Sequence, residues 1–526
     1  MEAAAPSAKK RRSAALDTGK STTPATAETS DPEATRAKKT SSPSSQEPPP
    51  PAPPGAGEEG EEEANGGGVD RISALPDAML GDIVTLLPTK DGARTQALAH
   101  RWRHAWRAAP LNLDFHRLPD DDDIDDGDGD DDDDEALAGA VSRILSSHHG
   151  PGRVFRVPAR HLGDRAAAVD AWLRSPALDN LQDIELCYPR RRPPLDHPPP
   201  LPATTFRFSA TLRSATFGQC QISDDVQGIR CFPHLRQLAL VQARVSEGSL
   251  QSMISRSSCP ALECLFLDSS HGFRRVQINS TTLRSIYVRT DYYGPDLRFL
   301  ELVVEDAPCL EKLLCAERVG FNVSVMAAAP KLQILGSLSN WLSCWSSPRH
   351  VFGSTVFEVM RLVRFTSVVC SVKVLSVDLI IDNNLDMVID IMKCFPCLEK
   401  LYIKGSISKK GDTNLWRQKH RRLIRGFDIH LKTLVLERYQ GIKSHVRFAS
   451  FFLLNAKELE VMRLEVEEKN CNEEFFAEQR LKLEVEGWAP GDDARVDFAL
   501  NRCKCRIIHI DHVRDLAIAD PFECTC

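Results

Sequence analysis

Leucine and other large apolar residues recur along much of the chain in a regular phrase. The phrase is a small or apolar residue, proline, a variable residue, leucine, two variable residues, and then apolar residues at alternate positions. Alternation of apolar and variable positions predicts a short β-strand with one buried face. Clear copies start at Phe232, Cys259 and Phe395, and weaker copies start at Thr282, Ala307 and Ala329.

The distance between copies indicates a repeat architecture. The first leucines of successive phrases, from Leu212 to Leu332, are 21 to 27 residues apart, within the ~20–29-residue period of leucine-rich repeats. One copy cannot bury its apolar side alone, so we expect the copies at residues 137–390 to stack into a curved α/β solenoid. The longer gap after Leu332 predicts an insertion around Trp341 and Trp345.

The side chains between the strand leucines are expected to point to the concave face of such a solenoid. Exposed aromatic and basic side chains at strand spacing are typical of surfaces that bind proteins. Burial of any one of them by a neighbouring loop is the alternative. The predicted target-binding residues are Phe266, Tyr287, Arg289, Lys400 and Tyr402.

Residues 69–112 instead carry apolar positions at helical spacing. Prolines flank a first predicted helix at 77–87, and Thr89 can cap a second helix. A third helical stretch holds Trp102 and Trp106, which are four residues apart and share a face. About forty residues of this kind do not make a stable core alone, so we expect a partner to complete the unit.

Four short motifs stand out in this segment: Asp-Arg-Ile-Ser-Ala-Leu-Pro (70–76), Leu-Pro-Thr-Lys (87–90), Arg-Thr (94–95) and Arg-Trp-Arg-His-Ala-Trp (101–106). These motifs are similar to those of an F-box. The chain resembles the plant subfamily that couples an F-box to leucine-rich repeats and a C-terminal FBD region, and residues 391–466 resemble the FBD region.

The resemblance implies a substrate-recognition subunit of an SCF-type (Skp-cullin-F-box) ubiquitin ligase, with no catalytic activity and no cofactor. The F-box would dock a Skp-type adaptor, and through it a cullin, while the repeats hold a target protein. A non-proteolytic repeat scaffold is the alternative. The sequence has no phosphate loop, nucleophile elbow or HExxH helix. The predicted adaptor-binding residues are Leu75, Pro76, Ile83, Leu87, Pro88, Leu98 and Trp102.

The amino-acid composition is unusual mainly in the residues that precede the repeats. Residues 1–68 have almost no large apolar side chains, so we expect a disordered tail. Its basic run Lys9–Arg12 is either a nuclear import signal or a solubilising tail, and we expect the protein in the nucleus, the cytoplasm or both. Twelve Asp and one Glu between Asp120 and Glu135 predict an extended acidic linker at 113–136, with the screening of a basic partner as the alternative.

The sixteen cysteines lie in apolar segments without a preceding secretory signal, which indicates reduced thiols. Cys394 and Cys397 have the CxxC spacing of redox and zinc sites, but packed thiols explain them better. In the extension 467–526 the cysteines and histidines match no familiar zinc finger, and residues 506–513 alternate like a strand. We expect no metal site in this chain. We also expect no membrane-spanning segment and no contact with nucleic acid.

Overall fold

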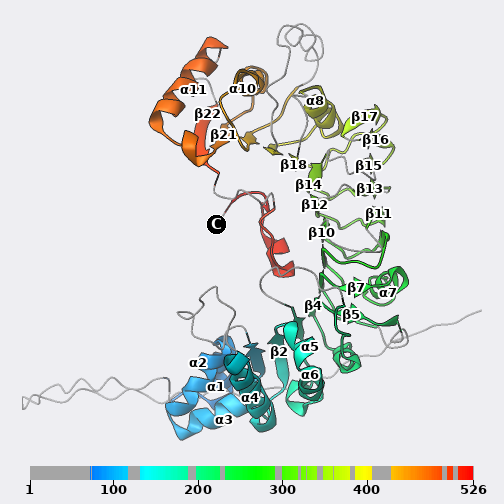
Figure 1. Cartoon of the computed structure of the whole chain (residues 1–526), viewed down its shortest axis with the longest axis vertical. Helices are drawn as coiled ribbons and strands as arrows, with labels where there is room; N and C mark the ends of the chain where they lie inside the picture. Colours follow the sequence, from blue (N-terminus) through cyan, green and yellow to red (C-terminus); the bar gives the residue numbers. More distant parts are fainter. Residues whose placement is uncertain are drawn as a thin grey trace, which may run out of the picture. The chain divides into compact units, whose positions relative to one another are not determined.

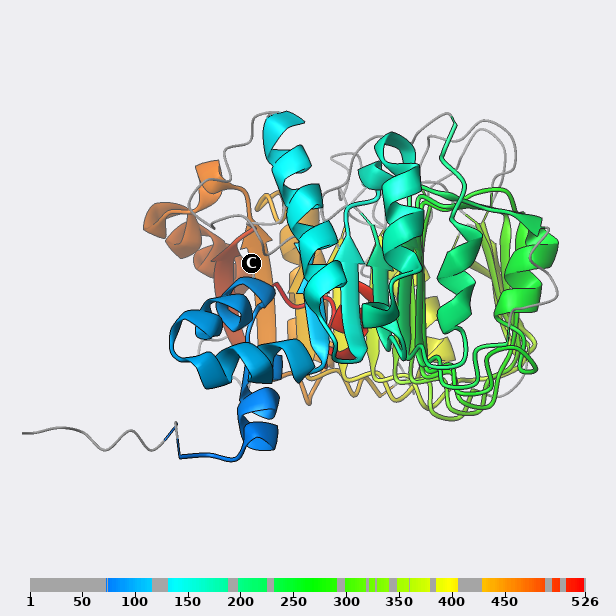
Figure 2. The same ribbon diagram turned by 90° about the horizontal axis from the view of Figure 1, so that it is seen from below.

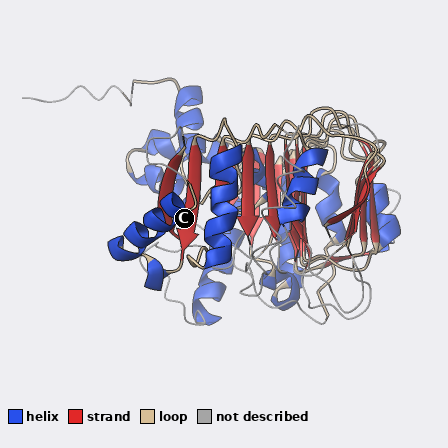
Figure 3. Ribbon diagram, turned by 90° about the horizontal axis from the view of Figure 1, so that it is seen from above, coloured by secondary structure: helices blue, strands red, loops and turns tan. Residues whose placement is uncertain are grey.

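The repeat phrases form the strands of one parallel sheet. Each repeat strand begins two residues after the first leucine of its phrase, as at Leu235 and Leu262. Figure 3 shows these strands side by side. In spatial order they are β1 (Leu111–Asp114), β2 (Gly152–Val157), β3 (Asp183–Leu186), β4 (Ser214–Gly218), β6 (Gln237–Val241), β8 (Cys264–Asp268), β10 (Ser285–Thr290), β12 (Lys312–Glu317), β14 (Ile334–Ser339), β18 (Val374–Asp378), β19 (Lys400–Lys404), β20 (Thr433–Leu436), β21 (Val461–Val466) and β22 (Arg495–Leu500).

This computed structural model describes the chain from residue 72 to residue 524, with gaps. The predicted import run, the acidic stretch at 116–130, and Trp341 and Trp345 lie outside the described residues. The described residues are 72, 74–115, 131–187, 197–224, 231–290, 299–317, 321–326, 329–339, 348–358, 360–378, 385–404, 428–487, 494–501 and 508–524.

The return segments of the repeats are of two kinds. In the middle of the sheet the return segments are strands. These strands form a second sheet of six: β9 (Arg275–Asn279), β11 (Glu301–Asp306), β13 (Asn322–Val325), β15 (Arg349–Phe352), β16 (Thr355–Glu358) and β17 (Arg361–Arg364).

Elsewhere the return segments are helices, and Figure 2 shows the longest of them, in cyan, alongside the first strands. A two-stranded sheet of β5 (Gln221–Ile222) and β7 (Arg244–Val245) lies between the two kinds. The helices are α4 (Asp131–Ser147), α5 (Arg160–Asp164), α6 (Ala166–Leu173), α7 (Glu247–Met253), α8 (Leu385–Cys394), α10 (Lys443–Asn455) and α11 (Glu473–Val485).

The repeat leucines build one continuous apolar cluster, which we call the main core. It lies between the large sheet and the return segments and includes Leu238, Leu265 and Leu313, each at most 1% exposed. The predicted solenoid-like α/β fold is thus present. The gap after Leu332 is filled by the antiparallel pairs β15–β16 and β16–β17.

The FBD-like region continues the repeat sheet. Strands β19, β20 and β21 pair in parallel with one another, and β22, from the extension, pairs with β21. The predicted division at residue 390 is therefore no break in the sheet. The predicted linker is also shorter than 113–136, since residues 113–114 lie in β1 and α4 begins at Asp131.

The segment with F-box motifs contains the helices α1 (Asp77–Leu86), α2 (Thr89–Arg94) and α3 (His100–Ala108), with a 3-10 turn, η1 (Thr95–Ala97), between the last two. The strand predicted around 506–513 is wrong for its described part. Residues 508–512 are irregular, and the 3-10 helix η8 (Val513–Ala517) follows them. Among the described residues, no helix is long and apolar enough to span a bilayer.

Candidate functional site

Helices α1 and α3 pack through a small apolar core of their own. Trp102 and Trp106 are 6% and 7% exposed and pack with Leu80 and Val84. Trp102 was predicted to contact an adaptor, but its side chain supports the helices from within. Buried tryptophans also offer no stacking surface to nucleic acid bases.

Helix α1 carries a second apolar stripe on its exposed side. Met79, Ile83 and Leu86, spaced four and three residues apart, are 50%, 36% and 81% exposed. The sequence predicted one apolar face on this helix, whereas the structure has two. An exposed stripe at helical spacing is typical of a helix that packs against a partner.

The other predicted adaptor-binding residues differ in exposure. Leu98 is 68% exposed, and Pro76 is also exposed. Leu75, Leu87 and Pro88 are half-buried, and Leu75 packs against the core of α1 and α3. Met79 and Leu86 were not among the predicted adaptor-binding residues, although their helical spacing relative to Ile83 places them on the same exposed side of α1.

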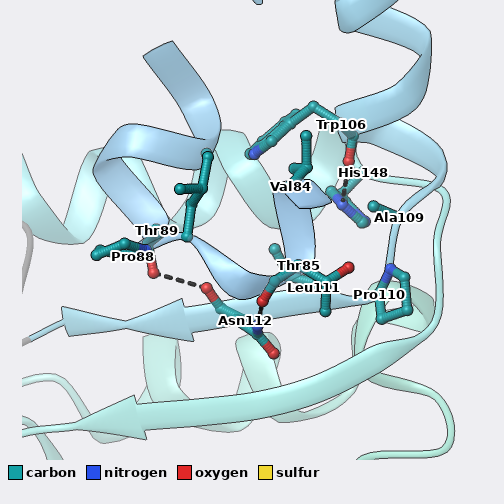
Figure 4. Close-up of a pocket in the computed structure, with 12 residues that line it drawn as sticks. Val84, Thr85, Pro88, Thr89, Trp106, Ala109, Pro110, Leu111, Asn112 and His148 are labelled. Carbon is teal, nitrogen blue, oxygen red and sulfur yellow. Dashed lines mark hydrogen bonds between the residues drawn. The ribbon is translucent and has the colours of Figure 1, made fainter. Parts of the chain in front are cut away.

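A small pocket lies where α1 and α2 meet β1 (Figure 4). Thr89 Oγ1 donates to the carbonyl oxygen of Asn112 at 2.6 Å and accepts from the N–H of Asp114 at 3.0 Å. The pocket volume is about 10 Å³, which is room for about one water molecule. We read this pocket as a junction between the helices and the sheet, not as a ligand site.

His148 closes the other side of this junction. Its Nε2 donates to the carbonyl oxygen of Trp106 at 2.9 Å, and its Nδ1 accepts from the N–H of Gly150 at 3.2 Å. A backbone N–H can only donate, so the proton of the neutral ring lies on Nε2. Burial lowers the pKa of His148, which favours this neutral form.

The second candidate site is the inner face, which we define as the face of the large sheet opposite to the main core. The predicted orientation of its side chains is right. Phe266 stacks on Tyr287 with ring centroids 4.4 Å apart and an interplanar angle of 8°. Its apolar members are Ala239, Phe266, Tyr287, Leu314, Ile334, Tyr402 and Val435.

Four of the five predicted target-binding residues are buried, as the alternative of burial allowed, because the chain itself covers the inner face; the side chain of Lys400 is 38% exposed. Phe266 and Tyr287 are 0% and 1% exposed, and Arg289 and Tyr402 are 8% and 6% exposed. The covering segment is residues 508–524, which we call the strap; Figure 1 shows it in red beside β10 and β12. Its apolar side chains on the inner face are Ile508, Ile510, Val513, Leu516 and Phe522.

One carboxylate anchors the strap above β19. Lys400 Nζ and the Tyr402 hydroxyl both donate to Asp520 Oδ2, at 3.0 and 2.9 Å. Burial, with the charge of Asp520, raises the pKa of Tyr402, so its hydroxyl keeps the proton that it donates. Phe522 lies next to Tyr402, with ring centroids 5.4 Å apart.

Basic groups fix the strap toward the first repeats. Arg514 Nη2 lies 3.2 Å from Asp183 Oδ2 and 3.1 Å from Glu185 Oε2. Burial alone would raise the pKa of Glu185, but a hydrogen bond to His512 and the charges of His512, Arg514 and Arg156 lower it to about 2. This carboxylate is therefore ionised at neutral pH and holds the strap electrostatically.

Between these two ends, a lysine of β12 binds two backbone carbonyl groups of the strap. Lys312 Nζ donates to the carbonyl oxygens of Leu516 and Ile518, at 2.9 and 2.6 Å. The strap also folds back on itself, since the N–H of His509 donates to the carbonyl oxygen of Pro521 at 2.8 Å. The strap therefore runs along the inner face, turns where η8 begins, and comes back along the same face. We call the returning segment, residues 514–522, the return arm.

Among the residues that the structure describes, the geometry does not support a metal or redox role for the cysteines. The prediction of packed thiols is right for Cys394, which is buried in the main core, and wrong for Cys397, which is exposed and interacts with Cys370. Burial raises the pKa of Cys394 to about 12, so it is a poor thiolate donor at neutral pH. In the described part of the chain, no three His, Cys, Asp or Glu side chains gather as a metal site would need.

Two family models match the chain. Residues 169–403 match the LRR repeats of FBD-associated F-box protein At5g56370, and residues 419–464 match FBD. The chain is thus similar to plant F-box/LRR/FBD proteins in its leucine-rich repeats and in its FBD region. The resemblance inferred from the sequence is thereby confirmed, and the FBD match lies inside the predicted region 391–466.

Three similar proteins are from Arabidopsis thaliana. FBD-associated F-box protein At5g56370 is 25% identical over 411 residues, 75% of this chain and 90% of that protein. F-box/LRR-repeat protein At3g26922 is 28% identical over 277 residues, 51% of this chain and 82% of that protein. Putative F-box/LRR-repeat protein At3g18150 is 26% identical over 256 residues, so the match spans about half of each chain (47% and 49%).

Proposed function

We propose that this chain is a substrate-recognition subunit of an SCF-type ubiquitin ligase. The exposed stripe of Met79, Ile83 and Leu86 carries the proposal, because it gives the segment with F-box motifs an uncovered apolar surface for a Skp-type adaptor. The repeats behind it would hold the target near the conjugating enzyme, so that the chain supplies proximity and the partners supply the chemistry.

Co-purification with a Skp-type adaptor and a cullin tests the proposal. Substituting Lys for both Met79 and Ile83 removes two apolar contacts and places two charges in the interface. We expect at least a hundredfold weaker adaptor binding, since each buried apolar side chain contributes about 1.5–3 kcal/mol. The matched control is Leu481→Lys, a substitution at a residue of α11 that is 59% exposed.

Two results would overturn the proposal. One is a wild-type chain that brings down no Skp-type adaptor, and the other is a Met79→Lys, Ile83→Lys variant that binds as tightly as wild type. If the adaptor binds but no protein accumulates when the chain is deleted, the non-proteolytic scaffold replaces the ligase subunit.

A further inference from the structure

The strap is separate from the apolar interior that holds the repeats together. No strap residue belongs to the main core, and every apolar strap residue in an apolar cluster packs only against the inner face. The repeats therefore bury their leucines with or without the strap. The inner face, in contrast, would present the stacked pair Phe266 and Tyr287 to solvent if nothing covered it.

The polar contacts of the strap have the spacing expected of a peptide that a sequence-specific site binds. On the return arm, the guanidinium of Arg514 meets Asp183 and Glu185, and the carboxylate of Asp520, six residues later, meets Lys400 and Tyr402. Phe522 follows two positions on and packs on Tyr402. Charged pairs at fixed distances around an apolar centre select a sequence, because a mismatched charge stays unpaired.

We propose that the inner face binds target proteins through a peptide segment with the chemistry of this return arm, and that the strap occupies the site until a target displaces it. The segment would carry a basic residue, an acidic residue six positions later and an aromatic residue two positions after that. The inference rests on the proposed function, because it names the class of target which the ligase subunit takes.

The test uses the full chain with a specific protease site inserted between residues 501 and 508, cut after folding. Before cutting, the tether holds the strap at an effective concentration in the millimolar range. After cutting, we expect the strap to exchange with a fluorescein-labelled peptide of residues 508–524, and labelled-peptide binding to be at least tenfold tighter than in the uncut chain.

Matched substitutions locate the binding in the proposed contacts. A peptide with Asp520→Asn should bind at least tenfold more weakly, because it loses the charge that Lys400 and Tyr402 bind. In the protein, Lys400→Met with Tyr402→Phe should cause the same loss, and combining both changes should add little more. Lys432→Met, a substitution at a lysine that pairs with Glu399 and not with the strap, is the control and should change nothing.

A random peptide library panned on the cut protein identifies the target class. We expect enrichment of an acidic residue two positions before an aromatic one. A strap that does not exchange after cutting, equal binding of the Asp520→Asn peptide, or enrichment without an acidic position would each overturn the inference. Adaptor binding is measured in the same samples, so a protein that binds peptide but no adaptor contradicts the proposed function alone.

Discussion

Glu437 lies among three other charged groups at the carboxyl ends of neighbouring strands. Lys404 Nζ is 3.6 Å from Glu437 Oε2, and Asp378 and Glu465 are the other two groups. Burial raises the pKa of Glu437 to about 7, with Glu465 and Asp378 adding to the rise and Lys404 opposing it. Burial is the main cause of this shift, so the folded state favours the protonated form below about pH 7.

This environment predicts a stability that falls as pH rises. Glu437 binds its proton more tightly folded than unfolded, so its contribution is complete below about pH 4.5 and is lost by about pH 7. At 1.36 kcal/mol per pKa unit, the loss is about 3 kcal/mol. Urea unfolding at pH 5 and pH 8 measures it. Relative to wild type, Glu437→Gln should gain stability between these two pH values, and parallel pH profiles would contradict the assignment.

Burial also raises the pKa of several cysteine thiols, and this lowers their reactivity at neutral pH. Burial raises the pKa of Cys220, Cys259 and Cys394 to about 12, whereas Cys231 and Cys471 are exposed. Iodoacetamide at pH 7.5, read out by mass spectrometry, should modify the exposed pair and leave the other three intact until the protein is denatured. Rapid modification of native Cys394 would contradict the packed-thiol reading.

At the scale of elements, the strands that carry a repeat phrase were predictable. The phrase encodes both the strand and its buried face, as in β6 and β8. Strands β1, β2 and β22 lack the phrase, and only pairing with a neighbour defines them. The apolar positions of α1 were predictable, but their division into a buried and an exposed stripe depends on Trp102 and Trp106 of another helix.

The segment that follows β20 packs against α11 at a position that requires glycine. Gly441 has φ +66°, and a Cβ there would lie 2.5–2.6 Å from side-chain atoms of Gln479, which is 0% exposed and accepts from the Tyr439 hydroxyl. We expect Gly441→Ala to lower the unfolding free energy by about 2–4 kcal/mol, from left-handed strain and a displaced buried amide.

Thermal and urea unfolding measure this effect. The matched control is Gly248→Ala in α7, where an added Cβ meets no atom within 4 Å. That variant should be as stable as wild type or slightly more stable, because Ala favours a helix. Equal stabilities of the two variants would show that Gly441 is not required by its conformation.

At the scale of the whole molecule, the continuity of the sheet was not predictable. Family resemblance suggested a boundary at residue 390, whereas the hydrogen bonding runs on through β19 to β22. The covered inner face was missed for a related reason. Local alternation predicts that Phe266 and Tyr287 point away from the leucines, but it carries no information on a segment more than two hundred residues later.

Truncating the chain at two positions tests the continuity of the sheet and the covering of the inner face separately. A chain ending at residue 390 leaves the edge of β18 unpaired and the inner face uncovered, so we expect aggregation in size-exclusion chromatography. A chain ending at residue 507 keeps all fourteen strands, and it should retain its circular dichroism while binding more of a hydrophobic dye. A soluble, cooperative fold for the shorter chain would show that the FBD region is a separate domain.

The strap also sets the order in which the protein is completed during synthesis. Its polar contacts join residues 118 to 331 positions apart in the chain, and about 220 residues separate Tyr287 from Ile508. At ~5–20 residues per second, ribosomes take roughly 10 to 45 s to cross that distance. During that interval the strap has not yet been made, so the aromatic pair lacks the cover that the mature protein gives it.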